Sequence, residues 1–315
     1  MGGELLINVD EVSRYFGKNC AIANISFTLQ RGEILGFLGP NGAGKSTTMR
    51  IICGVLPANS GRVTIAGFDI IEDAAAAKSR LGFLPEHPPL YPDQTVDEFL
   101  RYCGLLHRIP RTKLDAAVDN CKQRCGLESV GGRLIGNLSK GYQQRVGIAQ
   151  AIIHSPPVII FDEPTIGLDP NQIIGIRQLI HELGADHSVI LSSHILTEVQ
   201  SVCQRVIIIN EGRLVLDQSI HTLREDRHHE IFSIALENPP LPEELERIDG
   251  VTAVEVLDKN RFRIQCRALD NIPRKLMETA AGSGWGPYEL IPEKDTLETT
   301  FIRLTRGDSD QERAA

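Results

Sequence analysis

The amino-acid sequence predicts an α/β protein in which helices cover a mainly parallel sheet, followed by a smaller α+β domain. Short apolar runs alternate with amphipathic helical patterns over residues 4–222, and this alternation is typical of a parallel sheet with crossover helices. After about Leu223 the charged segment REDRHH interrupts the pattern. Beyond it, the predicted order of strand, helix, strand, strand, helix and strand is that of a ferredoxin-like domain, which we place at 229–305.

The elements of the first part follow from the spacing of their apolar residues. Two strands with alternating apolar residues open the chain, and GEILGFLG is a buried strand that leads into a glycine-rich loop. From about 88 to 155 the apolar residues recur at helical spacing, which indicates a helical subdomain. The later strands and helices are predicted, in order, in VIIFDEP, NQIIGIRQLIHELG, SVILSSH, LTEVQSVC and RVIIINEGRLVL.

The second part contains no recognisable catalytic constellation. Strands are predicted in EIFSIALE, VTAVEVL, RFRIQCRA and GPYELIPE, and helices in PEELERID and NIPRKLMETAAG. A last helix is expected in TLETTFIRLTR. Residues 306–315 are expected to form a disordered tail, because short polar termini are rarely held by packing.

Composition and charge argue against several classes of protein. The 315 residues carry a formal net charge of −8, which disfavours a broad nucleic-acid-binding face. The seven cysteines are scattered and odd in number, as expected for reduced thiols in a cytoplasmic protein. No apolar run approaches the ~20 residues of a membrane-spanning helix, so we expect any membrane role to come through a partner.

A glycine-rich loop stands between a predicted strand and a predicted helix. It fits the pattern G-x-x-x-x-G-K-[ST], in which backbone N–H groups turn inward around phosphate oxygens and the helix N-terminus adds partial positive charge. We expect Lys45 to neutralise the β- and γ-phosphates, Ser46 to bind Mg²⁺ and Thr47 to bond the α-phosphate. The residues of the loop are Gly39, Pro40, Asn41, Gly42, Ala43, Gly44, Lys45 and Ser46.

Further candidate residues stand at the ends of two other predicted strands. Asp162 follows the apolar run at 158–161, and a carboxylate at such a strand tip can hold Mg²⁺ through water. Glu163 is then placed to accept a proton from an attacking water. His194 ends the strand in VILSSH, and we expect it to contact the γ-phosphate. The sequence therefore predicts a site for a nucleotide and Mg²⁺.

The set of motifs and their order resemble the ATPase subunits of ABC transporters. The loop at 39–46 is followed by LSKGYQQR at 138–145, FDEP at 161–164, GLDP at 167–170 and SSH at 192–194. The chain most resembles the exporter branch that includes gliding-motility, copper-enzyme-maturation and multidrug-type ATPases. The resemblance implies a P-loop NTPase core of the ABC ATPase type, with an antiparallel β subdomain and an inserted helical subdomain. It also implies a homodimer in which two copies enclose two ATP molecules.

The resemblance assigns three further residues to this dimer. In the family, the signature loop of one copy faces the γ-phosphate held by the other copy, so Ser139 and Gly141 are expected to contact the partner's ATP. Asp169 in GLDP is expected at the dimer seam beside the sites. Lys140 and Tyr142 stand where the usual signature LSGGQ has Gly and Gln, but the two residues that carry the phosphate contacts are kept.

Two other positions depart from the family pattern or leave alternatives open. Glu86 stands where the family has a Gln that touches Mg²⁺ and the attacking water, and a similar Glu occurs in the same branch. Glu86 is therefore expected at the metal and the water, with a solvated loop acid as the alternative. Phe16, directly before Gly17, aligns best with the aromatic that stacks on adenine; Tyr15 is the second candidate, and an aromatic here could also belong to the core.

The sequence thus predicts an ATP-hydrolysing subunit that dimerises around ATP and drives a separate membrane permease, in the direction of export. The permease is expected to dock at about Pro88 to Tyr102, which would hold the protein at the inner face of the cell membrane. The alternative is a soluble ABC ATPase that acts on ribosome or DNA complexes, but this chain has one cassette, and residues 47–137 show no heptad run. A third reading, a module that binds ATP without hydrolysis, is disfavoured by Glu163.

Overall fold

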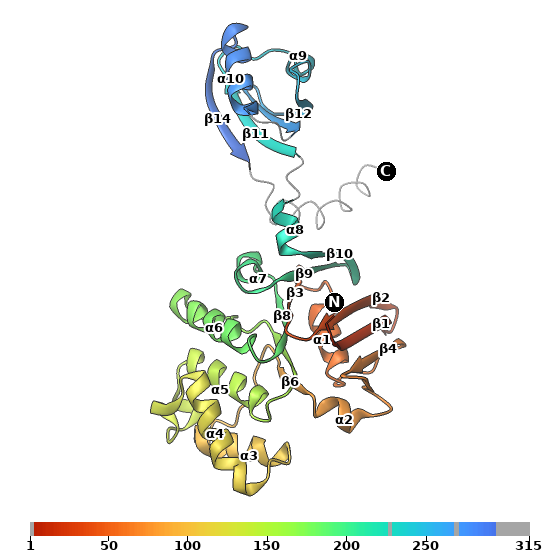
Figure 1. The fold of residues 1–315 in the computed structure, drawn as a ribbon, viewed down its shortest axis with the longest axis vertical. Coiled ribbons are helices and arrows are strands. Elements are labelled where there is room, and N and C mark those ends of the chain that lie inside the picture. Colours follow the sequence, from red (N-terminus) through yellow and green to blue (C-terminus); the bar gives the residue numbers. More distant parts are fainter. Residues whose placement is uncertain (1–2, 226–228, 268–270, 294–315) are drawn as a thin grey trace. The chain divides into compact units, whose positions relative to one another are not determined.

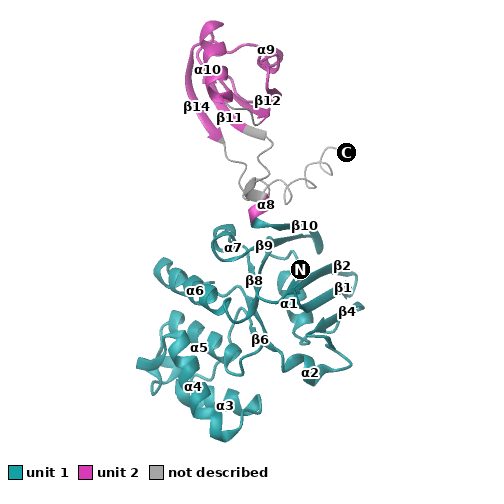
Figure 2. Cartoon of the chain, in the orientation of Figure 1, with its two compact units in different colours: residues 1–220 teal, residues 221–315 magenta. Residues whose placement is uncertain are grey.

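The computed structural model of the protein (Figure 1) describes residues 3–225, 229–267 and 271–293. The chain divides into two compact units, 1–220 and 221–315 (Figure 2). Each unit has a hydrophobic core of its own. The predicted domain limits stay predictions. The helix expected in TLETTFIRLTR and the expected tail lie outside the described residues.

A six-stranded sheet forms the centre of unit 1, with strand order β10-β9-β3-β8-β7-β6. The neighbours from β9 to β6 are parallel, and β10 pairs antiparallel with β9, so the prediction of a mainly parallel sheet is confirmed. The strand β6, in the sequence LGFL, was not predicted. The strands are β3 (Ile34–Leu38), β6 (Leu81–Leu84), β7 (Val158–Asp162), β8 (Ser188–Ser193), β9 (Arg205–Asn210) and β10 (Arg213–Ser219).

A second sheet of unit 1 is antiparallel, with strand order β2-β1-β4-β5. Its buried face shares one hydrophobic core with the central sheet and with the helix that follows β3. Phe27 of β2 and Phe37 of β3 meet there with ring centroids 5.5 Å apart. The strands are β1 (Leu5–Phe16), β2 (Asn19–Gln30), β4 (Ser60–Ile65) and β5 (Phe68–Asp69).

The helices of unit 1 form two groups. α3, α4 and α5 pack on one another at one end of the unit and form the predicted helical subdomain, whereas α1, α6 and α7 follow strands of the central sheet (Figure 1). A capping box starts α3, because Thr95 and Glu98 each accept a hydrogen bond from the other's backbone N–H. The helices are α1 (Lys45–Ile52), α2 (Ala74–Lys78), α3 (Val96–Leu106), α4 (Arg111–Cys125), α5 (Lys140–Ile152), α6 (Pro170–Leu183), α7 (Leu196–Val202) and, at the unit boundary, α8 (Ile220–Glu225), with 3₁₀ turns at Glu128–Val130 and Ile135–Asn137.

Among the helices that the structure describes, none combines the length and the apolar character needed to span a bilayer.

Unit 2 is an antiparallel sheet with strand order β12-β13-β11-β14. Apolar residues of β11 and β13 alternate toward a core that they share with α10, including Ile234, Ile264 and Leu276. The element order is the predicted βαββαβ order, which supports the ferredoxin-like assignment; that assignment stays a prediction. The elements are β11 (His229–Leu236), α9 (Pro242–Glu246), β12 (Val251–Asp258), β13 (Arg261–Arg267), α10 (Ile272–Gly282) and β14 (Pro287–Glu293).

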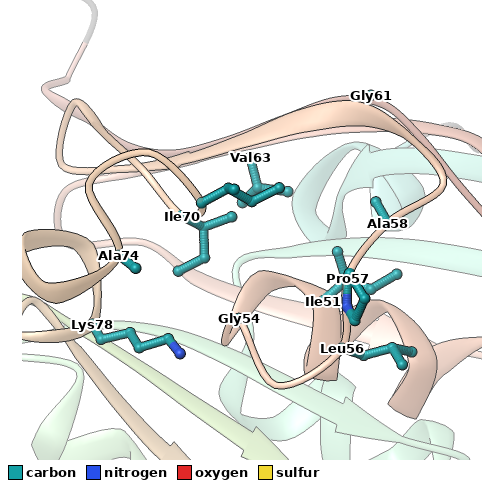
Figure 3. Close-up of a pocket in the computed structure, with 11 residues that line it drawn as sticks. Ile51, Gly54, Leu56, Pro57, Ala58, Gly61, Val63, Ile70, Ala74 and Lys78 are labelled. Atoms are coloured by element: carbon teal, nitrogen blue, oxygen red, sulfur yellow. The ribbon is translucent and has the colours of Figure 1, made fainter.

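An apolar cavity of about 260 Å³ lies beside the C-terminal end of α1 (Figure 3). Its walls include Ile51, Val63 and Ile70, and the stem of Lys78 reaches it from α2. Gly54 approaches this stem so closely that a Cβ atom there would lie 2.7 Å from the Lys78 Cε atom. None of the predicted site residues is among those that line this cavity, so it is separate from the predicted nucleotide site.

Because the two units have separate cores, a cavity created in one core is expected to spare the other. Ile234 is fully buried in unit 2, so Ile234→Ala is expected to lower the free energy of unfolding of that unit by about 2–5 kcal/mol. Hydrogen exchange resolved by segment should then show faster exchange in β11 and β13 and unchanged exchange in β3 and β8. Ile291→Ala is the matched control, since that side chain is exposed. Equal loss of protection in both units would contradict the expectation.

Candidate nucleotide site

The candidate residues converge because four neighbouring parallel strands end at one edge of the central sheet. β3, β8, β7 and β6 are adjacent and parallel, so their carboxyl ends, and the segments that follow them, lie side by side. Those segments carry the glycine-rich loop, His194, Glu163 and Glu86, respectively. The carboxyl edge of a parallel sheet is where such folds bind ligands.

A cavity of about 450 Å³ opens at this edge. Glu86, Glu163 and His194 face it from three different strand ends. Of the predicted loop residues, Gly39, Pro40 and Ala43 do not line it. The lining residues are Ala21, Asn41, Gly42, Gly44, Lys45, Ser46, Thr47, Glu86, Glu163, Ile166 and His194.

The backbone of the loop explains why glycine is needed in it. Gly42 and Gly44 have φ angles of 83° and 108°, in the left-handed region that other residues rarely adopt. At Gly44 a Cβ atom would also lie 2.6 Å from the Ile22 Cγ2 atom. Gly44 is the N-cap of α1 and gives it no side-chain cap, so the first N–H groups of that helix are available to an anion.

Lys45 is held inside the loop by a set of oxygen atoms. Its side chain is only 5% exposed, and Nζ donates to the carbonyl oxygens of Gly39 at 2.8 Å and Pro40 at 3.2 Å. The same Nζ lies 3.4 Å from Glu163 Oε1. A buried ammonium needs such partners, because an uncompensated charge away from water is costly. The ammonium is therefore fixed where phosphate oxygens can replace loop carbonyls as its partners.

Asp162 is buried and bridged by two hydroxyl groups. Ser46 Oγ donates to Asp162 Oδ1 at 3.2 Å, and Ser192 Oγ donates to the same oxygen at 2.5 Å. The sheet register places Asp162 directly opposite Ser192, whose oxygens also accept hydrogen bonds from the Glu163 N–H. Sequence reasoning did not select Ser192; the signal that points to it is the pairing of two strand ends. The structure therefore brings Ser46 and Asp162, two of the three residues predicted to bind Mg²⁺, into contact.

Glu163 lies between two nitrogen groups. Its Oε1 faces Lys45, and its Oε2 lies 2.8 Å from His194 Nδ1. The backbone of Glu163 has a φ of 50°, a strained value for a residue with a Cβ atom, and such strain is concentrated at functional sites. A carboxylate in this position can accept a proton from a water molecule in the cavity while the histidine ring keeps its orientation.

Glu86 follows β6 and faces the same cavity. Its side chain is 33% exposed, and Oε1 lies 4.0 Å from His87 Nδ1. The structure therefore brings Glu86 to the same cavity as the other predicted residues, and its role at the metal and the water stays a prediction.

The oxygen groups at this edge fit Mg²⁺. Ser46, Asp162 and Glu86 offer a hydroxyl and two carboxylates, the hard ligands that Mg²⁺ prefers. In the described part of the chain, no group of three or more His, Cys, Asp or Glu residues could hold a metal by itself. The donor set therefore suits an ion that keeps water and substrate phosphates among its ligands, as Mg²⁺ usually does.

The three residues expected at the partner copy are absent from the lining of the cavity. Ser139 is the N-cap of α5, and its Oγ accepts a hydrogen bond from the Tyr142 N–H at 3.4 Å. Asp169 is the N-cap of α6 and accepts one from the Gln172 N–H at 2.9 Å. Gly141 is buried against Gln172, and a Cβ atom there would lie 2.7 Å from the Gln172 Cδ atom. Ser139, Gly141 and Asp169 therefore do not complete this chain's own cavity.

The two aromatic candidates for adenine stacking are exposed at the end of β1. Neither Phe16 nor Tyr15 lines the cavity, but Ala21, in the strand that pairs with β1, does. The Arg14 guanidinium lies 4.9 Å from the centre of the Phe16 ring. The choice between the two aromatics stays open, and the stacking role stays a prediction.

The chain is similar to known proteins. The sequence profile of the family described as "ABC transporter" matches residues 22–166. The linearmycin resistance ATP-binding protein LnrL of Bacillus subtilis (strain 168) is 34% identical over 315 residues, which cover 95% of this chain and 98% of that protein. The Nod factor export ATP-binding protein I of Sinorhizobium fredii (strain NBRC 101917 / NGR234) is 31% identical over 310 residues, which cover 96% and 86%.

A solved structure of an ATP-binding subunit of an ABC transporter superposes with a TM-score of 0.64 and 28% identity, over 70% of this chain and 92% of that chain. These likenesses do not favour the alternative of a ribosome- or DNA-acting ATPase. The chain belongs to the ATP-binding subunits of ABC transporters, the ATP hydrolases of that family.

Proposed function

We propose that this chain hydrolyses ATP with the side chains at the carboxyl edge of the central sheet and drives a membrane permease that exports its cargo. The observation that carries the proposal is the contact of Glu163 with both Lys45 and His194 beside the cavity. These three residues come from three strand ends and need no rearrangement of the sheet to act together. The exporting direction is supported by relatives such as the Nod factor export protein.

In this proposal Glu163 accepts the proton of the attacking water, and His194 orients Glu163 and reaches the γ-phosphate. Lys45 exchanges its loop carbonyls for phosphate oxygens and stabilises the charge that develops on them. Ser46, Asp162 and Glu86 hold Mg²⁺, which neutralises charge on the phosphates when it is bound. The first-turn N–H groups of α1, together with Thr47, bind the remaining phosphate oxygens.

The second half of each site comes from a partner copy. Ser139 starts α5, so its hydroxyl and the N–H of Gly141 stand where the helix dipole favours an anion. Since neither residue lines this chain's own cavity, they are free to serve the γ-phosphate held by the other copy. Hydrogen bonds to a charged group contribute about 1.5–3 kcal/mol each, so a few of them can hold the dimer closed until hydrolysis removes the γ-phosphate.

The permease docks on the helical subdomain in this proposal, at the inner face of the cell membrane. Tyr91 and Tyr102 are exposed there, with ring centroids 5.8 Å apart, and Phe99 packs edge-on against Tyr91. Exposed aromatic side chains of this kind are common anchors of protein interfaces. Glu86 follows β6 and precedes this segment, so a single stretch of chain joins the cavity to the proposed docking surface.

Glu163→Gln is expected to keep ATP binding and to lower turnover by about a hundredfold, because the amide cannot accept the proton. The ATP-bound dimer should then persist, and size-exclusion chromatography in ATP and Mg²⁺ measures it. Glu211→Gln is the control, since Glu211 shares a positive φ but does not line the cavity. A Glu163→Gln variant that elutes only as a monomer in ATP would count against the proposal.

Lys45→Ala is expected to weaken ATP binding roughly ten- to a hundredfold, since it removes charge-assisted contacts to the phosphates. Titration calorimetry with ATP and Mg²⁺ measures the change. Lys78→Ala is the matched control, because Lys78 lines the separate apolar cavity. Unchanged affinity in the Lys45 variant would show that this lysine does not hold phosphate.

Ser139→Arg is expected to abolish ATP turnover while the monomer binds ATP normally, because the bulky side chain obstructs the partner's site and not its own. Ser79→Arg, at an exposed position after α2, controls for the added charge. Turnover and ATP affinity are measured on the same preparations. Normal hydrolysis by the Ser139 variant would overturn the role of this loop in the partner's site.

A further inference from the structure

We propose that Glu198 is a positioning residue that fixes the loop of His194 and ties it to α6. This inference rests on the proposed contact of His194 with the γ-phosphate. Glu198 lies in α7, and its carboxylate is only 1% exposed. A carboxylate buried from water needs hydrogen-bond donors or cations beside it. The groups that contact Glu198 indicate its role.

One carboxylate oxygen holds the residues on either side of His194. Ser193 Oγ donates a hydrogen bond to Glu198 Oε2 at 2.9 Å. The same hydroxyl accepts a hydrogen bond from the Ile195 N–H at 2.9 Å. Glu198 therefore holds the Ser193 hydroxyl, which is bonded to the backbone on the other side of His194. This contact fixes the backbone of His194 where it follows β8.

The other carboxylate oxygen faces α6. Glu198 Oε1 lies 3.7 Å from Arg177 Nη2, within ion-pair distance, and this buried oxygen accepts no hydrogen bond from the described residues. Arg177 is on the same helix as Asp169, the N-cap residue expected at the dimer seam. The ion pair thus joins α7 to a helix that begins beside the partner copy in the proposed dimer.

α6 also contacts the signature helix α5. Gln172 of α6 packs against Gly141, and a Cβ atom at Gly175 of α6 would lie 2.7 Å from the Arg145 Nη2 atom of α5. α6 therefore touches both the helix that starts at Ser139 and the helix that carries Glu198. A small displacement of α5 on dimer closure can reach His194 through packed helices and the ion pair of Arg177 with Glu198.

A double-mutant cycle on the full-length chain tests whether Glu198 acts through His194. Glu198→Ala is expected to lower kcat about tenfold or more, as small misplacements of catalytic groups do, with the Kd for ATP changed less than about twofold. In the His194→Ala background the same substitution is expected to have no further effect on kcat. If the two losses multiply, Glu198 does not act through His194 and the inference is wrong. If His194→Ala alone keeps normal turnover, the fault lies in the proposed role of His194.

Conservative variants separate positioning from stability. Glu198→Gln keeps an oxygen that can accept from Ser193 and should recover most of the kcat that Glu198→Ala loses. Ser193→Ala removes only the bridging hydroxyl and should reproduce the loss. Ser201→Ala is the control, because its hydroxyl bonds the Glu198 backbone carbonyl and not the carboxylate. Wild-type kcat in both Glu198→Ala and Ser193→Ala would overturn the inference.

A second readout does not depend on turnover. Hydrogen exchange of the nucleotide-free chain is expected to be faster at the Ile195 amide in Glu198→Ala and Ser193→Ala, and unchanged in Ser201→Ala. Unchanged exchange at Ile195 in Glu198→Ala would show that the carboxylate does not hold this loop.

Discussion

The buried pair of Lys45 and Glu163 is the interaction on which the rest of the nucleotide site depends. Both side chains are less than a tenth exposed, and their charged atoms lie 3.4 Å apart. Removing one partner of such a pair leaves an uncompensated buried charge and typically costs several kcal/mol. The surroundings reflect this constraint, since loop carbonyls satisfy the ammonium and His194 satisfies the second carboxylate oxygen. The ends of β3, β7 and β8 are thus joined through the Glu163 carboxylate as well as through the sheet.

The same constraint explains the polar residues beneath the cavity. Asp162 is next to Glu163 in the chain, and two like charges so close need separate partners. Ser46 and Ser192 supply hydroxyl donors to Asp162, so its charge is held on the side of β8 and α1. Burial raises the pKa of the nearby Cys53 thiol well above its usual range, and the Asp162 carboxylate raises it further. The thiol therefore stays protonated and adds no third negative charge.

Part of the candidate site could be predicted from residues adjacent in the sequence, whereas the residues of the signature loop were assigned only by the resemblance to the family. A glycine-rich loop before a helix and acidic residues after an apolar strand can be recognised from the neighbouring residues in the sequence alone. Ser192 was missed because its contact with Asp162 depends on the register of β7 and β8, which a sequence does not show. Glu198 was missed because it lies on the inner face of a short helix, where apolar residues are expected. β6 is only four residues long, too short for a periodic pattern, and Tyr15 and Phe16 stay ambiguous because register shifts interrupt the pairing of β1 just before them.

The side chains around the cavity carry more negative than positive charge, and this imbalance gives the proposed second copy a physical role. Glu86 and Glu163 line the cavity together with Lys45, and the buried carboxylate of Asp162 lies beside it, in contact with Ser46. A triphosphate entering such a site meets more negative than positive charge from the side chains. The first turn of α1 offsets part of it, since a helix N-terminus acts as roughly half a positive charge, and Mg²⁺ offsets more. In the proposed dimer, the N-terminus of α5 at Ser139 is a second positive helix end. In our proposal, this helix end lies at the γ-phosphate of the partner's nucleotide, where it would offset the remaining negative charge and favour closure of the dimer.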